Sequence, residues 1–386
     1  MMENTVKRKI VNLSSSALSI ASLFIAMLCF IFRAGNLYLP AKLEKIDLLA
    51  IKTVLPRKNF SIPNFSSSSF SLDYQKNNIP LPNGNNNNTQ TNPEQPGDNI
   101  KNDMELPQME DDLQNDEEHH DPNEKTYKII ETHIGAGGTK CENFYIKNTT
   151  GQNIDFSNLL NEIPDINIKN TSEPQVLIFH THTSESYMNK DNGFFYESFY
   201  PRSLNNSKNV IRVGDAITEK LKEHGINTIH DATYHDNPSY NGSYLRAEKT
   251  IKNNLQKYPS LQVVIDIHRD SLGSKETGKT KPIFKYKDKK AAQLMIISGC
   301  DPDNTNGFPN WQKNLKLALN IQKYCENMFP GITRPLNFSK VKYNEHLTPG
   351  SLLIEIGSDG NTLEEAVYTG SMLGEALSKL LNDLKK

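Results

Sequence analysis

Three short apolar runs along this chain each end at a histidine or a carboxylate. His180 and His182 follow the run at 176–179, His268 follows the run at 263–267, and Glu355 follows the run at 352–354. A run of four or five aliphatic residues predicts a buried strand. Open α/β sheets build their sites where several strands end. The pattern therefore predicts that folding gathers these ionisable groups at one edge of a sheet.

Helical and strand periodicities alternate from the first of these runs to the end of the chain. Strands are predicted at 176–180, 226–230, 262–267, 293–298 and 351–356, and helices at 208–224, 243–257, 310–328 and from the cap residue Thr362 onward. Gly225 is expected to end the first of these helices. Such alternation predicts an α/β domain, with a mostly parallel sheet flanked by helices on both faces.

The N-terminal region has the pattern of a membrane anchor. Residues 13–32 carry no charge and are mostly apolar, and Lys7, Arg8 and Lys9 precede them. About 20 apolar residues cross a bilayer as a helix, and preceding cations favour a cytoplasmic N-terminus. We expect a cytoplasmic tail at 1–12, a transmembrane anchor at 13–33 and an extracytoplasmic remainder. A cleaved signal peptide is the alternative.

The following segment, 34–126, is expected to be a juxtamembrane stretch and a disordered linker. It contains Ser and Asn runs, and residues 103–124 hold ten carboxylates with no Lys or Arg. Such a composition buries too little apolar surface to offset chain entropy, so it suits a tether. The folded catalytic domain is then expected at 127–386.

Charge and cysteine content narrow the chemistry. The net charge of −2 gives no support for a general nucleic-acid binder, which would normally carry a basic excess. Outside the predicted anchor, Cys141, Cys300 and Cys325 lie far apart and form no C-x-x-C motif. Any metal is therefore expected to be held by nitrogen and oxygen.

Two imidazoles and two carboxylates at strand ends make a hydrolytic zinc site the leading hypothesis. His182 and Glu185 lie in the exit loop of the first strand, and His268 ends a middle strand. Glu355 is the expected general base, because a carboxylate among aliphatic residues is costly unless it is paired or ligated. Asp266 is expected to orient a neighbouring imidazole.

The same three blocks resemble a known family. His-Thr-His-Thr-Ser-Glu-Ser-Tyr at 180–187, Asp-Ile-His-Arg-Asp at 266–270, and Tyr343-Asn344 followed by Leu-Leu-Ile-Glu-Ile-Gly-Ser-Asp-Gly-Asn-Thr-Leu-Glu-Glu-Ala at 352–366 are similar to the stage II sporulation protein P family. That resemblance covers about 130–386. It implies a membrane-anchored peptidoglycan hydrolase of engulfment, related to zinc N-acetylmuramoyl-L-alanine amidases.

Carried onto this chain, the resemblance makes His182 and His268 the imidazole ligands and Glu355 the catalytic residue. Amidases usually supply a ligand Glu at the start of the helix after the first strand. Here residues 205–209 hold no carboxylate. Glu185 is the predicted substitute, and His180 competes with His182 for the ion.

Four further residues are candidates for substrate binding. Arg269 and Asp270 adjoin a predicted ligand and could grip a substrate carboxylate or amine, since arginine forms bidentate bonds with carboxylates. A local ion pair between them is the equal alternative. Asn344 and Asn361 could bind peptide or sugar amides, although asparagine is common in turns.

The resemblance also implies the biological setting. The expected reaction is cleavage of the amide between N-acetylmuramic acid and L-alanine, with an additional cross-link endopeptidase activity, at the septal or engulfing membrane. The implied partners are a lytic transglycosylase, stage II sporulation protein D, and stage II sporulation protein M. A non-catalytic wall-binding scaffold and a zinc peptidase acting on protein remain alternatives.

Overall fold

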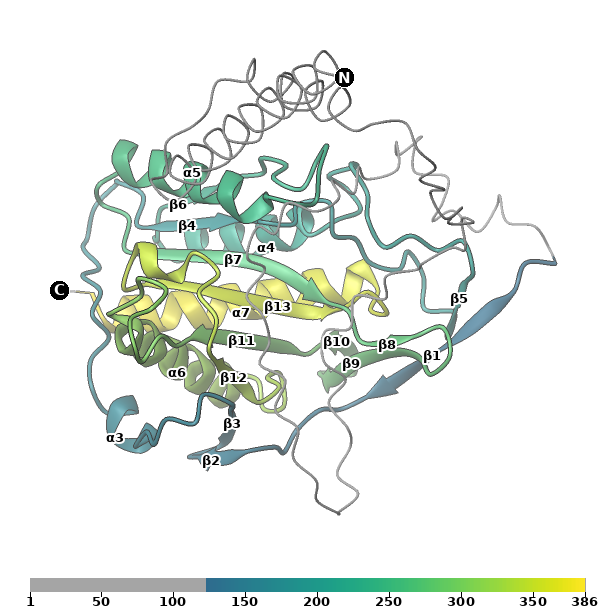
Figure 1. Ribbon diagram of the computed structural model, residues 1–386, viewed down its shortest axis with the longest axis horizontal. Helices are drawn as coiled ribbons and strands as arrows, with labels where there is room; N and C mark the ends of the chain where they lie inside the picture. Colours follow the sequence, from purple (N-terminus) through teal and green to yellow (C-terminus); the bar gives the residue numbers. More distant parts are fainter. Residues whose placement is uncertain (1–122, 386) are drawn as a thin grey trace, which may run out of the picture. The chain divides into compact units, whose positions relative to one another are not determined.

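The computed structural model describes residues 123–385, and its main feature is an eight-stranded sheet (Figure 1). In spatial order its strands are β2 (Thr139–Cys141), β3 (Phe144–Asn148), β12 (Leu336–Ser339), β11 (Leu294–Gly299), β13 (Ser351–Ser358), β7 (Val263–Asp270), β4 (Val176–Phe179) and β6 (Thr228–His230).

Strand direction changes once in the middle of this sheet. Strands β13, β7, β4 and β6 are parallel to one another, whereas β11 is antiparallel to β13. Strands β12 and β3 are parallel to β11, and β2 closes the edge as an antiparallel hairpin. The α/β class is confirmed, and the sheet is mixed although most of its pairings are parallel. The four parallel strands bring their carboxyl ends to one edge.

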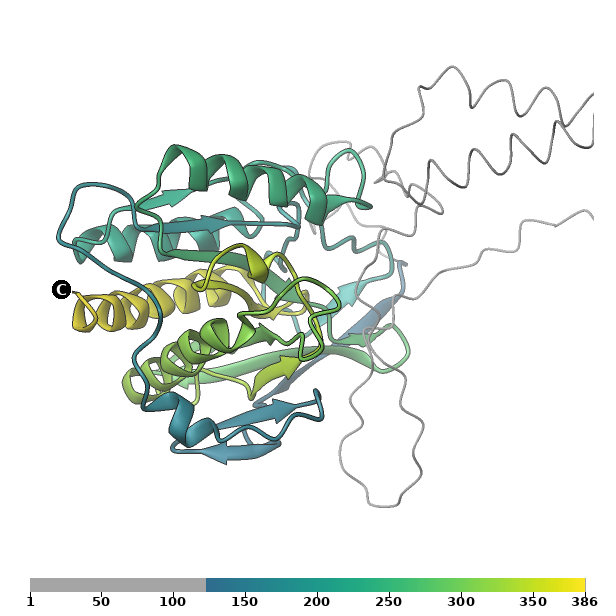
Figure 2. The same ribbon diagram turned by 60° about the vertical axis from the view of Figure 1, so that its left-hand side comes forward.

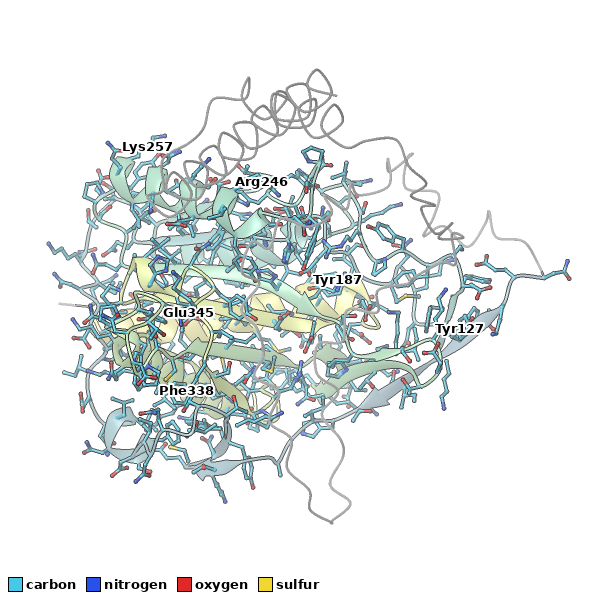
Figure 3. The ribbon with its side chains drawn as sticks, viewed as in Figure 1. Tyr127, Tyr187, Arg246, Lys257, Phe338 and Glu345 are labelled. Carbon is cyan, nitrogen blue, oxygen red and sulfur yellow. The ribbon has the colours of Figure 1, made fainter. Side chains whose placement is uncertain are left out.

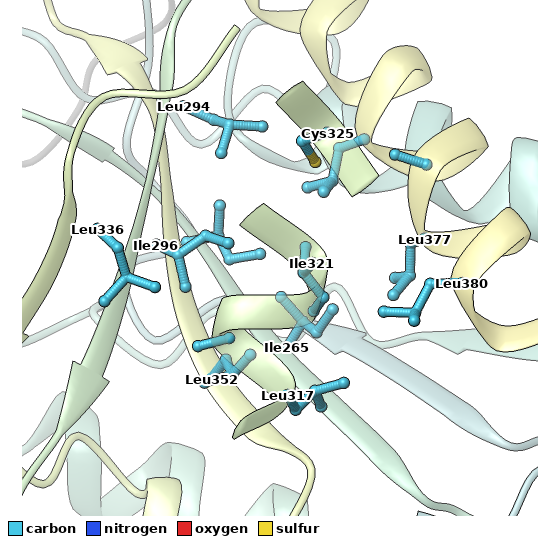
Figure 4. Packing of buried hydrophobic residues seen from close by; sticks show 14 of the residues in the cluster. Ile265, Leu294, Ile296, Leu317, Ile321, Cys325, Leu336, Leu352, Leu377 and Leu380 are labelled. Atoms are coloured by element: carbon cyan, nitrogen blue, oxygen red, sulfur yellow. The ribbon is translucent and has the colours of Figure 1, made fainter. Parts of the chain in front are cut away.

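Helices cover the two faces unequally. The large apolar cluster packs α4 (Ile211–Glu223), α6 (Trp311–Met328) and α7 (Leu363–Asp383) against one face of the sheet. Figure 4 shows part of this core, where α6 and α7 meet side chains of β11, β12 and β13. On the opposite face α5 (Ser243–Lys257) packs over β4 and β7. The short α3 (Phe156–Leu160) lies beside the β2–β3 hairpin (Figure 2).

Local sequence explains where several helices begin and end. The hydroxyl of Thr362 accepts from the backbone of Glu365, whose carboxylate accepts from the Thr362 backbone in return, so α7 starts with a capping box. Gly225 follows α4 with a φ of 74°, which glycine adopts without steric cost. Helix α5 has the bounds that the sequence predicts, 243–257.

A second sheet was not predicted. Its main path runs β10 (Lys289–Ala292), β9 (Gly278–Tyr286), β1 (Thr126–Thr132) and β5 (Phe194–Tyr196), with β8 (Gly273–Ser274) paired to β9. Strand β9 contains Pro282 and three lysines, which are poor strand signals. Its pairing with β1 joins segments about 150 residues apart, as Ile129 faces Lys279. Such non-local pairing leaves no short-range pattern to recognise.

Membrane anchoring is not addressed by this part of the chain. Within 123–385, no helix combines the length and apolar character needed to cross a bilayer. The predicted tail, the predicted anchor at 13–33 and the predicted linker up to residue 122 lie outside the described residues.

Candidate active site

The strand-end residues meet on the sheet face that α5 partly covers. Asp266 and His268 alternate with Ile265 and Ile267 along β7, so they share one face. In the β13–β7 register Glu355 pairs with His268. All three side chains are buried. The predicted juxtaposition of His268 and Glu355 therefore follows directly from strand pairing.

His268 lies between two carboxylates. Its Nε2 is 2.8 Å from Asp266 Oδ1, and its Nδ1 is 3.4 Å from Glu185 Oε2. Burial alone would lower the pKa of His268, but Asp266 and Glu185 outweigh it and raise the pKa to about 10. Asp266 is itself held by the backbone N–H of Thr181, at 2.8 Å, and by the Thr181 hydroxyl, at 2.6 Å.

Glu185 is fixed beside the start of α4. Its backbone carbonyl accepts from Val210, the residue before that helix, at 2.9 Å. Its Oε2 accepts from the backbone N–H of Arg269 at 3.1 Å. Burial alone would raise the pKa of Glu185, but Arg269 and His268 hold it well below the usual value. The fold thus brings a carboxylate to the helix start that lacks one in sequence.

His182 lies beside His268. The centroids of the two imidazole rings are 5.3 Å apart, and the ring planes are at 86° to each other. On another side His182 stacks on Tyr240, with centroids 4.4 Å apart and planes at 10°. The loop that carries His182 is therefore positioned partly by an aromatic contact.

His180 points to the opposite face of the sheet. Its Nδ1 is 2.8 Å from the carbonyl oxygen of Ile267, and its Nε2 is 2.9 Å from His230 Nε2. His230 Nδ1 in turn lies 3.0 Å from Asp215 on α4. Both ring nitrogens of His180 are therefore used by internal contacts. Of these two candidate metal ligands the geometry favours His182, because its ring is the one that lies beside His268.

The donor set suits a zinc ion. Two ligands on a tetrahedral zinc with bonds of about 2.0–2.2 Å lie about 3.4 Å apart, and Glu185 Oε2 and His268 Nδ1 have that separation. Asp266 at the other ring nitrogen matches the carboxylate–imidazole pairs that orient zinc ligands. The ligand atoms of His182, Glu185 and His268 do not all lie within 4.8 Å of one another. Since Glu185 and His268 are close together, the donor atom of His182 is the one that lies farther away.

One acidic group in the described residues does meet that spacing, and it contains none of the predicted ligands. It consists of Glu131, Asp191 and Glu365. The ammonium of Lys281 is 3.3, 2.7 and 2.8 Å from their carboxylates and is 1% exposed on its side chain. Lys281 already pairs with all three carboxylates, and Lys290 pairs with Glu131 and Asp191 as well, so lysines occupy this cluster and Lys281 ties β9 to the start of α7.

The other predicted substrate residues are engaged in internal contacts. Arg269 donates to the carbonyl oxygens of Ser186 and Pro201, and Asp270 pairs with Arg334 at 3.0 Å. The amide of Asn344 donates to the Tyr244 carbonyl, and Asn361 accepts from Ser358 in the turn before α7. Their substrate-binding roles stay predictions, and the structure gives each of them a structural contact.

Tyrosines near the site were missed by the sequence analysis. Tyr244, on the first turn of α5, meets His182 edge-on at 5.6 Å and stacks with Tyr343 at 5.3 Å. The available signal was a pair of tyrosines, Tyr240 and Tyr244, shortly before and at the start of α5. Tyr187, labelled in Figure 3, is buried in the main apolar core, where its hydroxyl donates to the Ile356 carbonyl.

Two basic residues hold the loops around this site. Arg202 is 2.8 Å from Asp236 and 3.8 Å from Glu185, and it lies over the ring of Tyr240 at 4.9 Å. Arg246 of α5, labelled in Figure 3, donates to the carbonyl oxygens of His235 and Asn241. The contacts of Arg246 are those of a loop-packing residue.

Comparison with known proteins identifies the family. The family model described as stage II sporulation protein P matches residues 57–378, which is most of the chain. The chain belongs to this family. Over 223 residues it is 30% identical to stage II sporulation protein P of Bacillus subtilis (strain 168). That alignment covers 55% of this chain and 52% of the relative, so it spans about half of each protein. The resemblance predicted from the sequence is confirmed.

Solved structures of amidases show a weaker similarity to this stage II sporulation protein P family member. An N-acetylmuramoyl-L-alanine amidase from Clostridium difficile 630 is 15% identical, with 55% of this chain and 97% of that chain covered and a TM-score of 0.33. One from Nostoc punctiforme is 12% identical, with 55% and 98% covered and a TM-score of 0.30. These scores are too low to carry a conclusion about this chain.

Proposed function

We propose that this protein is a sporulation peptidoglycan hydrolase that cleaves the amide between N-acetylmuramic acid and L-alanine of the stem peptide. Membership of the stage II sporulation protein P family supports the setting. The observation that carries the chemistry is the pairing of buried Glu355 with His268, whose Nδ1 lies 3.4 Å from Glu185. A base beside a ligand pair is the arrangement that metal-assisted amide hydrolysis requires.

His182, Glu185 and His268 would hold the zinc ion, which supplies Lewis-acid activation of water and of the amide carbonyl. Asp266 keeps one nitrogen of His268 occupied, so the other nitrogen, which faces Glu185, is the one that would hold the ion. Glu355 would accept the proton of the attacking water. It would then return that proton to the departing amine of L-alanine.

The proposed location follows from the predicted anchor. A single helix at 13–33 would hold the protein in the septal or engulfing membrane, with the hydrolase domain outside the cytoplasm. Cooperation with stage II sporulation proteins D and M, and an added cross-link endopeptidase activity, belong to the same proposal. A tethered wall-binding scaffold is the alternative, but such a binder has no need of a buried carboxylate paired with a histidine.

Digestion of purified sacculi by the full-length protein in detergent tests this function. We expect release of stem peptides with a new L-alanine amine, stopped by a metal chelator and restored by added Zn²⁺. Sacculus binding without any released peptide would support the scaffold instead. Release of peptides that lack an L-alanine terminus would assign the activity to a different bond.

A further inference from the structure

Four aromatic rings form a continuous row from the candidate active site to the surface. In spatial order the row consists of Tyr240, His182, Tyr244 and Tyr343, and we call it the aromatic row. His182 stacks on Tyr240, Tyr244 meets His182 edge-on, and Tyr343 stacks on Tyr244 with planes at 29°. The three tyrosines are partly exposed, whereas His182 is buried. The row therefore links a predicted ligand to solvent.

The outer end of the row is held by an unusual backbone. Tyr343 and Asn344 both have positive φ, at 40° and 61°, although neither is glycine. This conformation is strained for a residue such as tyrosine and persists only where the surrounding structure imposes it, often at ligand sites. The Asn344 amide donates to the Tyr244 carbonyl at 2.9 Å. This bond fixes the two tyrosine-bearing segments to each other.

Tyr343 lies on the same sheet face as the catalytic candidate. It packs against the cluster formed by Ile297, Val341 and Leu353. Leu353 is two residues before Glu355 on β13, so both side chains are on one face.

The charged groups beside the site are already engaged. Arg269 and Arg334 are 4% exposed and are bound to protein oxygens, and Arg202 pairs with Asp236. A substrate carboxylate would have to displace one of these bonds. Flat, partly exposed phenol rings instead suit a ligand with an apolar face and polar edges. A pyranose ring has that character, because its C–H groups form a face and its hydroxyls project from the rim.

Resting on the proposed function, we propose that Tyr343 and Tyr244 form the subsite for a sugar ring of the glycan strand. The ring lies along the outer aromatic row, and the lactyl amide attached to it extends past Tyr244 toward His182 and Glu355. The aromatic row thereby makes the enzyme specific for substrates in which the cleaved amide is attached to a sugar ring.

Two substrates with the same scissile bond test this subsite. One is a disaccharide tripeptide, and the other is the matching N-lactoyl tripeptide, which lacks the sugars. We expect Tyr343→Ala to lower kcat/KM on the disaccharide substrate about tenfold, mainly through KM, and to lower it far less on the lactoyl peptide. Tyr343→Phe, which keeps the ring, should restore the wild-type values. An equal loss on both substrates, or no loss on the disaccharide substrate, overturns the proposal.

A binding measurement separates this proposal from the proposed function. Saturation-transfer NMR would measure binding of the peptide-free disaccharide to the full-length protein. This measurement needs no turnover. Binding lost in Tyr343→Ala but kept in Tyr343→Phe supports the subsite even if neither substrate is cleaved; binding unchanged in Tyr343→Ala refutes it. Tyr145→Ala, a partly exposed tyrosine on β3, is the matched control, and thermal unfolding checks that each variant is folded.

Discussion

His268 and Glu355 face the same way from neighbouring parallel strands, at paired positions in the β7–β13 register. They are 3% and 2% exposed, so both belong to the buried edge of the sheet rather than to mobile loops. Strand pairing sets the distance between their backbones, since neighbouring strands lie about 4.8 Å apart. The predicted ligand and the predicted base are therefore positioned by strand pairing in the main sheet.

Replacing Glu355 should stop turnover without removing the metal. Glu355→Gln keeps the side-chain shape but cannot accept a proton, so amide release from sacculi should fall by about 10²–10⁴-fold. Zinc content, measured by mass spectrometry of the purified protein, should stay equal to wild type. Glu364→Gln, an exposed residue in the first turn of α7, is the matched control. Activity near wild type in Glu355→Gln would remove Glu355 from the mechanism.

The two histidines of the His-Thr-His segment should respond differently to substitution. His182→Ala should lose bound zinc with a modest change in stability, because His182 is the imidazole beside His268. His180→Ala should keep zinc but lower the free energy of unfolding by about 1–3 kcal/mol, because it removes a fully buried ring and leaves partly buried His230 without its 2.9 Å contact. Metal analysis and urea titration of both proteins check this. Zinc lost from His180→Ala and retained by His182→Ala would reverse the assignment.

The contact between α4 and α7 depends on a glycine. A Cβ at Gly374 would lie 2.7 Å from Lys220 Cβ and 2.9 Å from the Ile217 carbonyl oxygen. Gly374→Ala should therefore push the helices apart and destabilise the protein by about 1–3 kcal/mol, although alanine is the better helix former. Urea unfolding measures the change. Ser371→Ala is the control, because its hydroxyl donates within the helix to Val367; a stabilised Gly374→Ala variant would contradict the packing.

Glu345 predicts a pH-dependent stability. It is 1% exposed, its Oε2 accepts from the Gly299 backbone at 2.9 Å, and burial raises its pKa well above the usual value (Figure 3). The contribution of protonated Glu345 to the free energy of unfolding is fully present below the pKa of this group in the unfolded chain, near 4.5. As pH rises further the unfolded chain ionises first, so the free energy of unfolding falls by up to about 1.4 kcal/mol per pH unit until the folded pKa is passed.

Glu345→Gln should remove that slope, because glutamine keeps the acceptor and does not ionise. Urea unfolding at pH 5, 7 and 9 should show the variant gaining stability relative to wild type as pH rises. A difference between the two proteins that does not grow with pH would mean that Glu345 is already ionised in the folded state.

Much of the scaffold was predictable because its signals are local. Helix α5 has its predicted bounds, and Thr362 caps α7 as its hydroxyl and the following acidic residues suggested. Strands β4, β7, β11 and β13 fall within a few residues of the predicted runs, since an aliphatic run reports burial directly. The sheet of β1, β5, β9 and β10 was missed, because its strands are charged or short and β1 pairs with β5 and β9 across long stretches of chain.

The sequence by itself determined which residue types follow the strands and which family the chain resembles. Only the tertiary structure decided which of those side chains meet. His180 and His182 look equivalent along the chain, but the chain turns after β4, where Thr181 binds Asp266. His180 therefore faces α4 and His230, while His182 faces His268. The same holds for Tyr343, whose strained backbone acquires its stacking partner only when α5 is packed on the sheet, because such contacts depend on three-dimensional packing rather than on periodicity.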